Sequence, residues 1–375
     1  MYNYIYKKIG GGRQMKKLLS IFSAAVLVVA CMPFVSALTY NYFAYEVIDA
    51  ENIKITGYGD LHTENVYVPA QIDGIPVTAI GDNVFKSKYA IKTVVIPASI
   101  TEIGANAFYD CRNLSSLVMG TGVKKIGSHC FTNCKALNAV NLQNIEEISE
   151  YSFYGCSALE QLNMGSALKI IGRYSFYGCK LLNMIRFSQV LESIGDYAFY
   201  NCIAVESFVF PDSLNYIGNS AFAGCKKLAS VTFGKGELDI AGYAFENCEV
   251  LTAVTLPANI KSIGRYAFAM RDETLFNGKN IEITCTGHSA GFAYCFGTDI
   301  EPTVSDYGSR KVKPGNVDGK GGITTDDARA ALAIAAQLKP ADETQLLLAD
   351  VNGNGWCDTT DARMILQKAI GVYKV

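Results

Sequence analysis

The sequence predicts an α+β repeat protein, in which a solenoid of short strands and turns is followed by a small helical domain. Two patterns predict it: isoleucine and phenylalanine recur every 23 residues through the middle of the chain, and another pattern recurs after 34 residues near its C-terminus. The composition excludes general disorder, since 50% of the residues are hydrophobic and only 18% are charged. The formal net charge of -2 lacks the basic excess that nucleic-acid binding requires.

Residues 1–37 have the features of an export signal. Met15 and the two lysines after it make a positive start, an apolar run follows over 18–30, and small residues lead to a cleavage site after Ala37. We therefore expect Met15 to be the true start and the mature protein to be secreted. A lipoprotein, in which Cys31 is acylated, is the alternative. The apolar run is shorter than the ~20 residues of a transmembrane helix, and no later segment is predicted to span a membrane.

The 23-residue repeat aligns three residue types in columns. The first column is Ile80, Ile103, Ile126, Ile148, Ile171, Ile194, Ile217, Ile240 and Ile263. The second is Phe85, Phe108, Phe131, Phe153, Phe176, Phe199, Phe222, Phe245 and Phe268. The third is Cys111, Cys134, Cys156, Cys179, Cys202, Cys225 and Cys248. An apolar L-x-x-L-x-L triplet follows each cysteine. The pattern is that of a leucine-rich-repeat solenoid, and each unit is expected to add one strand and one short turn.

Residues 80–300 resemble the BspA-like leucine-rich repeats, whose pattern is I-G-x-x-A-F-x-x-C-x-x-L-x-x-V-x-L-P, as 194–202 illustrate. Residues 38–79 resemble the β-rich N-terminal cap of that family. The last unit departs from the pattern at Arg271, and we expect the stretch from there to Ile300 to form a C-terminal cap. The resemblance implies a secreted or surface-exposed protein of adhesion or protein binding, without catalytic residues in its repeats.

The repeat columns account for residues that suggest catalysis at first sight. His129 and Cys130 are neighbours, but other units place tyrosine and alanine or serine in their columns, so no catalytic role is expected. His288 lies near Cys285 and Cys295 at a spacing that matches no zinc pattern, and we expect all three to pack in the cap. The cysteine column is expected to hold buried free thiols. The chain has no recognisable catalytic motif, so we predict that it is not an enzyme.

The C-terminal part divides into an expected linker, 301–314, and a region, 315–375, with two copies of a calcium-loop pattern. The second copy has the spacing D-x-N-x-N-G, with aspartate at the twelfth position. Its expected Ca²⁺ ligands are the side-chain oxygens of Asp350, Asn352, Asn354, Asp358 and Asp361 and the carbonyl oxygen of Trp356. Six matching positions predict one strong calcium site in this loop.

The first copy departs from the pattern. Its expected ligands are Asn316, Asp318, Thr324 and Asp327. Lys320 replaces an oxygen ligand, and an ammonium group has no lone pair to donate, so we expect weak calcium binding or none. Helices are predicted after the loops, over 325–338 and 360–370, with no clear helix before either loop. The apolar face of the first helix is expected to carry Ala328, Leu332, Ala335 and Leu338.

Two loop–helix copies in residues 315–375 resemble a type I dockerin, the module that attaches secreted proteins to the cohesins of a scaffoldin in a cellulosome. The resemblance implies a small all-α domain, calcium-dependent cohesin binding and a place among proteins of polysaccharide degradation. It assigns the cohesin contacts to loop positions 10 and 11, which are Thr325, Asp326, Thr359 and Thr360.

These patterns favour a secreted, non-catalytic protein that docks onto cohesin and presents its solenoid to a protein or cell-surface ligand. In one alternative the solenoid binds a glycan, with the column of Tyr151, Tyr174 and Tyr197 as a stacking platform. We favour packing and protein contact as the role of these residues over glycan stacking. The other alternative is a glycoside hydrolase, which needs two opposed carboxylates about 5 to 9 Å apart. The repeats show no paired acidic column apart from residues 146–147, which lie on the turn side.

Overall fold

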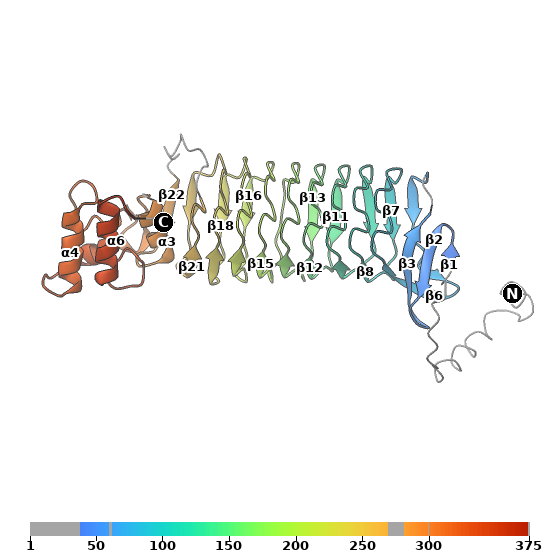
Figure 1. Ribbon diagram of the computed structural model, residues 1–375, viewed down its shortest axis with the longest axis horizontal. Helices are drawn as coiled ribbons and strands as arrows, with labels where there is room; N and C mark the ends of the chain where they lie inside the picture. The colour runs from blue at the N-terminus through green and yellow to red at the C-terminus, as the bar shows by residue number, and fades with distance from the viewer. Residues whose placement is uncertain (1–37, 60–61, 269–280, 299, 374–375) are drawn as a thin grey trace, which may run out of the picture.

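The computed structural model describes residues 38–59, 62–268, 281–298 and 300–373. The predicted export signal, with Met15, Cys31 and Ala37, and the expected departure at Arg271 lie outside the described residues. Figure 1 shows a stack of coils with a β-rich N-terminal end and a group of helices at the opposite end. Among the helices in the described ranges, none has the length and apolar content needed to cross a membrane.

Antiparallel strands cover the N-terminal end of the stack. The first six strands are β1 (Leu38–Tyr40), β2 (Phe43–Val47), β3 (Ile53–Tyr58), β4 (Asn65–Tyr67), β5 (Gln71–Ile72) and β6 (Ile75–Ile80). Strands β1, β2 and β3 pair antiparallel, and β3 pairs in parallel with β6, where the repeats begin. The rings of Phe43 and Tyr58 lie 6.4 and 5.2 Å from the ring of Phe85, so aromatic side chains close this end of the phenylalanine column.

Most repeat units contribute strands to two separate sheets, so the expectation of one strand per unit is wrong. The isoleucine column forms β8 (Glu102–Ile103), β10 (Lys125–Ile126), β12 (Glu147–Ile148), β14 (Ile170–Ile171), β15 (Ser193–Ile194), β17 (Tyr216–Ile217), β19 (Leu238–Ile240) and β21 (Ile260–Ile263). The apolar triplets form β7 (Thr93–Ile96), β9 (Ser116–Met119), β11 (Ala139–Leu142), β13 (Gln161–Met164), β16 (Ser207–Val209), β18 (Ser230–Thr232), β20 (Ala253–Thr255) and β22 (Glu282–Cys285). The isoleucine strands follow strand alternation in two residues, since in most units a polar residue facing solvent precedes a buried isoleucine.

Successive units pair in parallel and in register, as Ile171 with Ile194 and Ile194 with Ile217. A glycine follows the isoleucine in most units and allows this close stacking. A Cβ at Gly218 would lie 2.5 Å from the backbone nitrogen of Asp196 in the preceding unit, so only glycine fits there.

The core contains two columns of side chains that repeat with the coils. Rings of successive phenylalanines stack with centroids 4.8 to 5.4 Å apart, from Phe85 to Phe268. The cysteine column is buried, as predicted, and each thiol donates a hydrogen bond to a phenylalanine carbonyl of the preceding unit, for example Cys156 Sγ to Phe131 O at 3.1 Å. Burial raises the pKa of Cys156 to about 12, so these thiols stay protonated and unreactive.

The segment expected to be a linker, 301–314, adds two strands to the solenoid instead. These are β23 (Thr303–Val304) and β24 (Arg310–Lys311), joined by the 3₁₀ helix η1 (Ser305–Tyr307). Strand β23 pairs in parallel with β22, and β24 pairs antiparallel with β23. The interpretation as a linker failed because Val304 is fully buried against the last coil, a contact that proline and glycine content does not reveal.

Four helices lie at the C-terminal end: α3 (Ala290–Thr298), α4 (Thr325–Ala335), α5 (Glu343–Ala349) and α6 (Thr359–Ala369). Helix α5 corrects the expectation that no helix precedes the second loop; it begins at a capping box between Asp342 and Gln345. The predicted apolar face of α4 is also wrong in part. Leu332 and Leu338 are exposed, because α4 packs against α6 through Ala331 and Ile334.

The helices α4–α6 pack against the end of the solenoid (Figure 1). Phe296 of α3 belongs to their core, and its ring lies 5.2 Å from that of Tyr373. In return, Leu347 of α5 belongs to the core of the solenoid. Arg310 Nη2 donates to Thr344 Oγ1 at 2.8 Å. We call residues 315–373 the C-terminal module and α3 with the chain around it, 285–298, the cap helix region.

Candidate functional site

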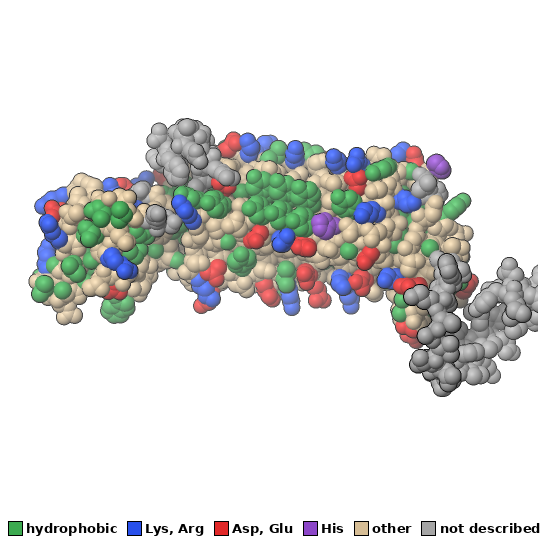
Figure 2. Space-filling view, in the orientation of Figure 1, with side chains coloured by type: hydrophobic (Ala, Val, Ile, Leu, Met, Phe, Trp, Pro, Cys, Tyr) green, Lys and Arg blue, Asp and Glu red, His purple; other side chains and the backbone are tan. Residues whose placement is uncertain are grey.

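Two parallel columns of aromatic side chains lie on the turn side of the solenoid. The first column continues from His129 through Tyr151, Tyr174 and Tyr197, and the second contains Tyr154, Tyr177 and Tyr200. We call these seven residues, with Tyr109 at the N-terminal edge, the aromatic surface. All eight side chains are partly exposed. Figure 2 shows a continuous patch of hydrophobic-class side chains, a class that includes tyrosine, over the middle of the solenoid with a histidine at its edge.

The rings of the aromatic surface stack on one another along each column. Centroids are 4.7 Å apart between Tyr151 and Tyr174 and again between Tyr174 and Tyr197, with interplanar angles of 5° and 10°. The second column has the same geometry, at 4.8 and 4.9 Å. Ring faces are therefore covered by neighbouring rings, and what the surface offers to a partner is ring edges and phenol hydroxyls.

The first column has an unusual backbone. His129, Tyr151, Tyr174 and Tyr197 all have positive φ, between 55° and 58°. Asparagine tolerates this left-handed conformation better than tyrosine does, and Asn106 occupies the same column. Tyrosine is therefore placed here against the local backbone preference.

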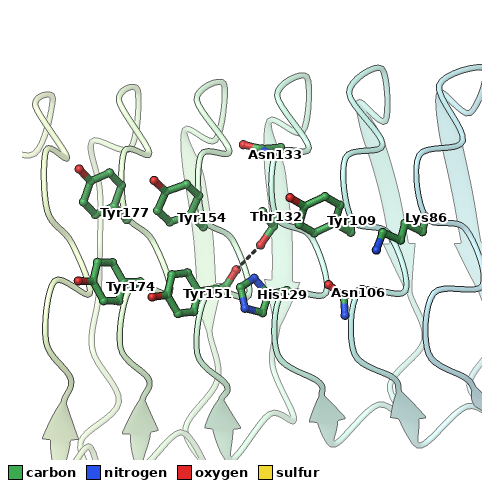
Figure 3. Close-up of a pocket in the computed structure, with 10 residues that line it drawn as sticks. All are labelled: Lys86, Asn106, Tyr109, His129, Thr132, Asn133, Tyr151, Tyr154, Tyr174 and Tyr177. Atoms are coloured by element: carbon green, nitrogen blue, oxygen red, sulfur yellow. Dashed lines mark hydrogen bonds between the residues drawn. The ribbon is translucent and has the colours of Figure 1, made fainter.

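An open hollow of about 550 Å³ lies at the N-terminal half of the aromatic surface. Figure 3 shows the residues that line it: Lys86, Asn106, Tyr109, His129, Thr132, Asn133, Tyr151, Tyr154, Tyr174 and Tyr177. Thr132 Oγ1 donates to the Tyr151 carbonyl at 2.7 Å, which fixes the turn beneath the rings (Figure 3). The lining offers amide, ammonium, imidazole and phenol groups beside ring edges, a mixture suited to hydrogen bonding with a polar partner.

Nearby charges and burial act on the tyrosines. The Arg173 guanidinium lies 5.8 Å from the ring centroids of both Tyr151 and Tyr174 and pairs with Glu150 at 3.1 Å. Burial, with the neighbouring phenols, raises the pKa of Tyr174 and of Tyr177. Their hydroxyls therefore remain protonated and able to donate hydrogen bonds.

The second predicted calcium loop is closed by hydrogen bonds from backbone amides to side-chain oxygens. Asp350 Oδ1 accepts from Gly353 and Asn354, and Oδ2 accepts from Gly355 at 2.8 Å. Asp361 accepts from the amides of Asn352 and Asp358, each at 3.0 Å. Asn352 and Asn354 each accept a bond from the amide two residues on, and Asp358 caps α6. The loop thus gathers the predicted side chains around one turn, with Trp356 at its rim and 77% exposed.

The first loop follows a similar backbone path, but its polar side chains have different hydrogen-bond partners. Asp327 is fully buried and accepts from the amides of Asp318 and Thr324. Asn316 takes the position of Asp350, and its Oδ1 is buried without a hydrogen-bond partner among the described residues. Lys320 is exposed, and its amide donates to Asp318 at 2.8 Å. This loop therefore has an oxygen available but one carboxylate fewer.

The donor set of the second loop fits calcium. Asp350 and Asp361 are fully buried carboxylates. Burial raises the pKa of Asp361, and the nearby Asp350 and Asp358 carboxylates raise it further, so negative charge is gathered where a cation would relieve it. Over the part of the chain that the structure describes, no group of three or more His, Cys, Asp and Glu side chains is assembled as a metal cluster. A calcium ion here would consequently depend on the amide oxygens of Asn352 and Asn354 and on a carbonyl as well as on carboxylates.

The four residues predicted to contact cohesin lie at the first turns of α4 and α6. Thr325, Asp326, Thr359 and Thr360 are all exposed. Asp326 forms an ion pair with Arg329 at 2.9 Å. Both pairs thus lie on the surface of the module.

Sequence reasoning missed two features of these sites. The second tyrosine column has a visible pattern, Phe-Tyr at 153–154, 176–177 and 199–200, which the 23-residue period could have revealed. The other is His288, expected to pack in the cap. Its Nδ1 lies 2.6 Å from Oδ2 of Asp350 in the second loop, while Cys285 and Cys295 are buried in the cap helix region. His288 and Asp350 are 62 positions apart, and no sequence pattern links the cap helix region to the calcium loop.

Comparison with family models gives one match. Residues 78–202, 146–274 and 192–295 match the BspA type leucine rich repeat region, in six copies. Together these ranges span more than half of the chain and include the whole aromatic surface. The C-terminal module lies beyond them.

Solved structures give similarities in fold. The chain resembles a leucine rich cell surface protein of Faecalibacterium prausnitzii with 24% identity and a TM-score of 0.53, covering 72% of this chain and 82% of that one. It also matches the T. pallidum leucine rich repeat protein at 24% identity and a TM-score of 0.42, covering 58% of this chain and 91% of that one. Curated proteins give no match.

Proposed function

Since the chain belongs to the BspA-type leucine-rich repeat family, we propose that it is a non-catalytic binding protein displayed outside the cell, whose aromatic surface contacts a partner protein. The observation that carries the proposal is the aromatic surface itself. Its rings are partly exposed over successive coils, and the tyrosines of the first column lie on a backbone conformation that tyrosine disfavours. The name of the Faecalibacterium prausnitzii relative, a cell surface protein, supports the proposed location.

A protein partner suits the surface better than a stacked sugar. Sugars stack on open ring faces, whereas these faces are covered by neighbouring rings at 4.7 to 4.9 Å. Tyrosine edges and hydroxyls are common in protein interfaces because they combine apolar area with hydrogen bonding. One observation keeps the glycan as a second candidate: the first column continues with Ser220 after Tyr197, so one face of Tyr197 has no ring above it in the column.

We also propose that the C-terminal module attaches the protein to a cohesin in a calcium-dependent manner. Support comes from the paired loops, the charge gathered in the second loop and the exposed Thr359 and Thr360 beside it. In this proposal the second loop holds the stronger Ca²⁺ ion, and the first holds Ca²⁺ weakly or not at all. The ion would neutralise buried carboxylates and stiffen the turn that presents the contact residues.

The solenoid proposal is tested by probing residues 38–375 in parallel on an array of secreted and cell-surface proteins and on a glycan array. Tyr174→Asn and Tyr177→Asn should abolish the protein signals, whereas Val209→Asn, an exposed apolar residue of β16, should leave them unchanged. Protein binding that survives both tyrosine changes contradicts the proposal. Glycan signals that depend on Tyr197 would favour the second candidate.

The module is tested separately with a purified type I cohesin on a biosensor. Binding should require Ca²⁺, should be lost in excess EDTA and in Asp350→Ala, and should weaken on change of Thr359 and Thr360. Binding in EDTA would contradict the calcium-dependent mechanism, and failure of several cohesins to bind at saturating Ca²⁺ would contradict the dockerin assignment.

A further inference from the structure

The cap helix region supplies a hydrogen bond to the first ligand position of the second calcium loop. Asp350 is fully buried and has four donors. Three are amides of its own loop, from Gly353, Asn354 and Gly355. The fourth is the imidazole of His288, whose Nδ1 lies 2.6 Å from Oδ2 and which belongs to the solenoid end of the chain.

The contact is held by close backbone packing on both sides. His288 has φ of 50°, a left-handed conformation that residues with a Cβ adopt infrequently. Opposite it, Gly353 has φ of 73°, and a Cβ there would lie 2.4 Å from the carbonyl oxygen of Ser289. Nearby, the Lys368 ammonium donates to the carbonyl of Phe296. The loop and the cap helix region therefore meet in one defined orientation.

The first loop has no equivalent arrangement. Asn316, at the position of Asp350, donates through its amide nitrogen to the carbonyl of Gly321, and its Oδ1 is buried with no hydrogen-bond partner in the described parts of the chain. The two loops thus differ in orientation of their first ligand as well as in charge. Only in the second is that ligand held by a group from outside the loop.

We propose that His288 is a positioning residue of the second calcium loop: by bonding to Oδ2 it fixes the orientation of the Asp350 carboxylate, the group that would hold the ion, so that the solenoid end and the loop form one calcium site. The inference rests on the proposed function, because it requires Ca²⁺ in this loop. A neutral imidazole donates through Nδ1–H without adding positive charge beside the ion. Partners that orient metal ligands typically contribute 10- to 100-fold in metal affinity.

Linkage gives the proposal a second consequence. If contact with the solenoid raises calcium affinity, calcium must strengthen that contact by the same factor. Calcium would then fix the C-terminal module against the solenoid and set the direction in which the aromatic surface projects from a bound cohesin.

Calorimetric titration of residues 38–375 with CaCl₂ at about pH 8 tests the proposal. His288→Ala should weaken the tighter site at least about tenfold. His288→Asn should keep most of the affinity, since its side-chain amide can donate from nearly the same place and asparagine tolerates a positive φ. The control His62→Ala changes an exposed histidine between β3 and β4, at the N-terminal end of the solenoid, and should bind calcium as the wild type does. Circular dichroism establishes that each variant is folded.

Hydrogen exchange supplies an independent readout. Calcium should slow exchange in 285–298 in the wild type and in His288→Asn, and should do so less in His288→Ala. Unchanged or tighter calcium binding in a folded His288→Ala variant overturns the inference while leaving the proposed function intact. Absence of calcium binding in the wild type overturns both this inference and the proposed calcium-dependent attachment to cohesin.

Discussion

The phenylalanine column inside the solenoid and the first tyrosine column on its surface have the same ring stacking, but they differ in burial and in backbone conformation. Both follow the 23-residue period, and both stack rings about 5 Å apart and nearly parallel. The inner rings, such as Phe176 and Phe199, are fully buried on ordinary backbone. The outer rings, such as Tyr174, are half-exposed on left-handed backbone. Ring stacking alone therefore does not explain why either residue type is present.

The phenylalanine column is needed for the stability of the fold, whereas the fold only tolerates the tyrosine column. A buried phenylalanine gains from removal of its whole surface from water and from contact with coils on both sides. A half-exposed tyrosine gains less, and part of that gain is offset by the cost of the left-handed backbone, about 1–2 kcal/mol for a residue with a Cβ. The inner column is thus fixed by folding, and the outer column is free to be chosen for contact with a partner.

The largest expected effect is in the inner column. Phe199→Ala should lower the free energy of unfolding by about 3–5 kcal/mol, because it leaves a cavity among the stacked rings of Phe176 and Phe222. Tyr197→Ala, in the same unit of the outer column, should cost less than about 1.5 kcal/mol. Urea unfolding followed by circular dichroism measures both. Equal losses would break the comparison between the two columns.

The cysteines next to the inner rings predict a pH dependence. Cys156 has a pKa of about 12 in the folded protein and 9.0 as its ordinary value, so the folded state retains a proton that the unfolded chain releases. The stability from this group is fully present below about pH 9 and is lost as pH rises toward 12, by up to about 1.4 kcal/mol per pH unit.

Cys156→Ala should therefore flatten the fall in unfolding free energy between about pH 9 and pH 10.5, measured in urea with a reductant present. Phe199→Leu is the control, since it changes packing without removing a titrating group, and its curve should run parallel to that of the wild type. A Cys156→Ala curve that is also parallel would show that the thiol titrates alike in both states.

What the sequence predicted correctly in the solenoid is what repeats. The isoleucine, phenylalanine and cysteine columns predicted the stacked coils and the buried core because nine units report the same local environment. The first tyrosine column, exposed on the turn side, was visible for the same reason. The short strands of the isoleucine column were not predicted, because one exposed residue followed by one buried isoleucine is too short a pattern to mark a strand.

Features that lie outside the 23-residue repeats were either missed by the sequence analysis or remain predictions. Strands β23 and β24 and helix α5 occur once each; Val304 of β23 pairs with Cys285, and Leu348 of α5 accepts a hydrogen bond from the Gly315 amide. The contact between His288 and Asp350 joins two such regions, so neither residue shows it alone. The calcium ligands were proposed from spacing, and the structure brings them around one turn without testing whether the ion binds.

A smaller effect is expected from two serines in one inner column. Ser175 Oγ is buried without a hydrogen-bond partner among the described residues, whereas Ser152 Oγ donates to the carbonyl of Ser149 at 2.7 Å. Ala198 shows that the column accepts alanine. Ser175→Ala should stabilise the protein by about 1 kcal/mol, and Ser152→Ala should destabilise it by a similar amount. Shifts of the same sign in urea midpoints would refute the explanation.

The smallest effect on stability should come from the outer column, where the effect on binding is largest. Tyr174→Asn removes stacking on Tyr151 and Tyr197, which is typically worth about 0.5–1.5 kcal/mol per aromatic pair. It also relieves the left-handed backbone, since asparagine occupies the same column at Asn106. The two changes oppose each other, so the free energy of unfolding should shift by less than about 1 kcal/mol. The matched change Asn106→Tyr should be destabilising unless its ring stacks on His129, the next residue of the column. Urea unfolding of both variants measures these changes. If Tyr174→Asn lowers the free energy of unfolding as much as Phe199→Ala does, the tyrosines stabilise the solenoid. The proposal that the aromatic surface is a binding site would then fail.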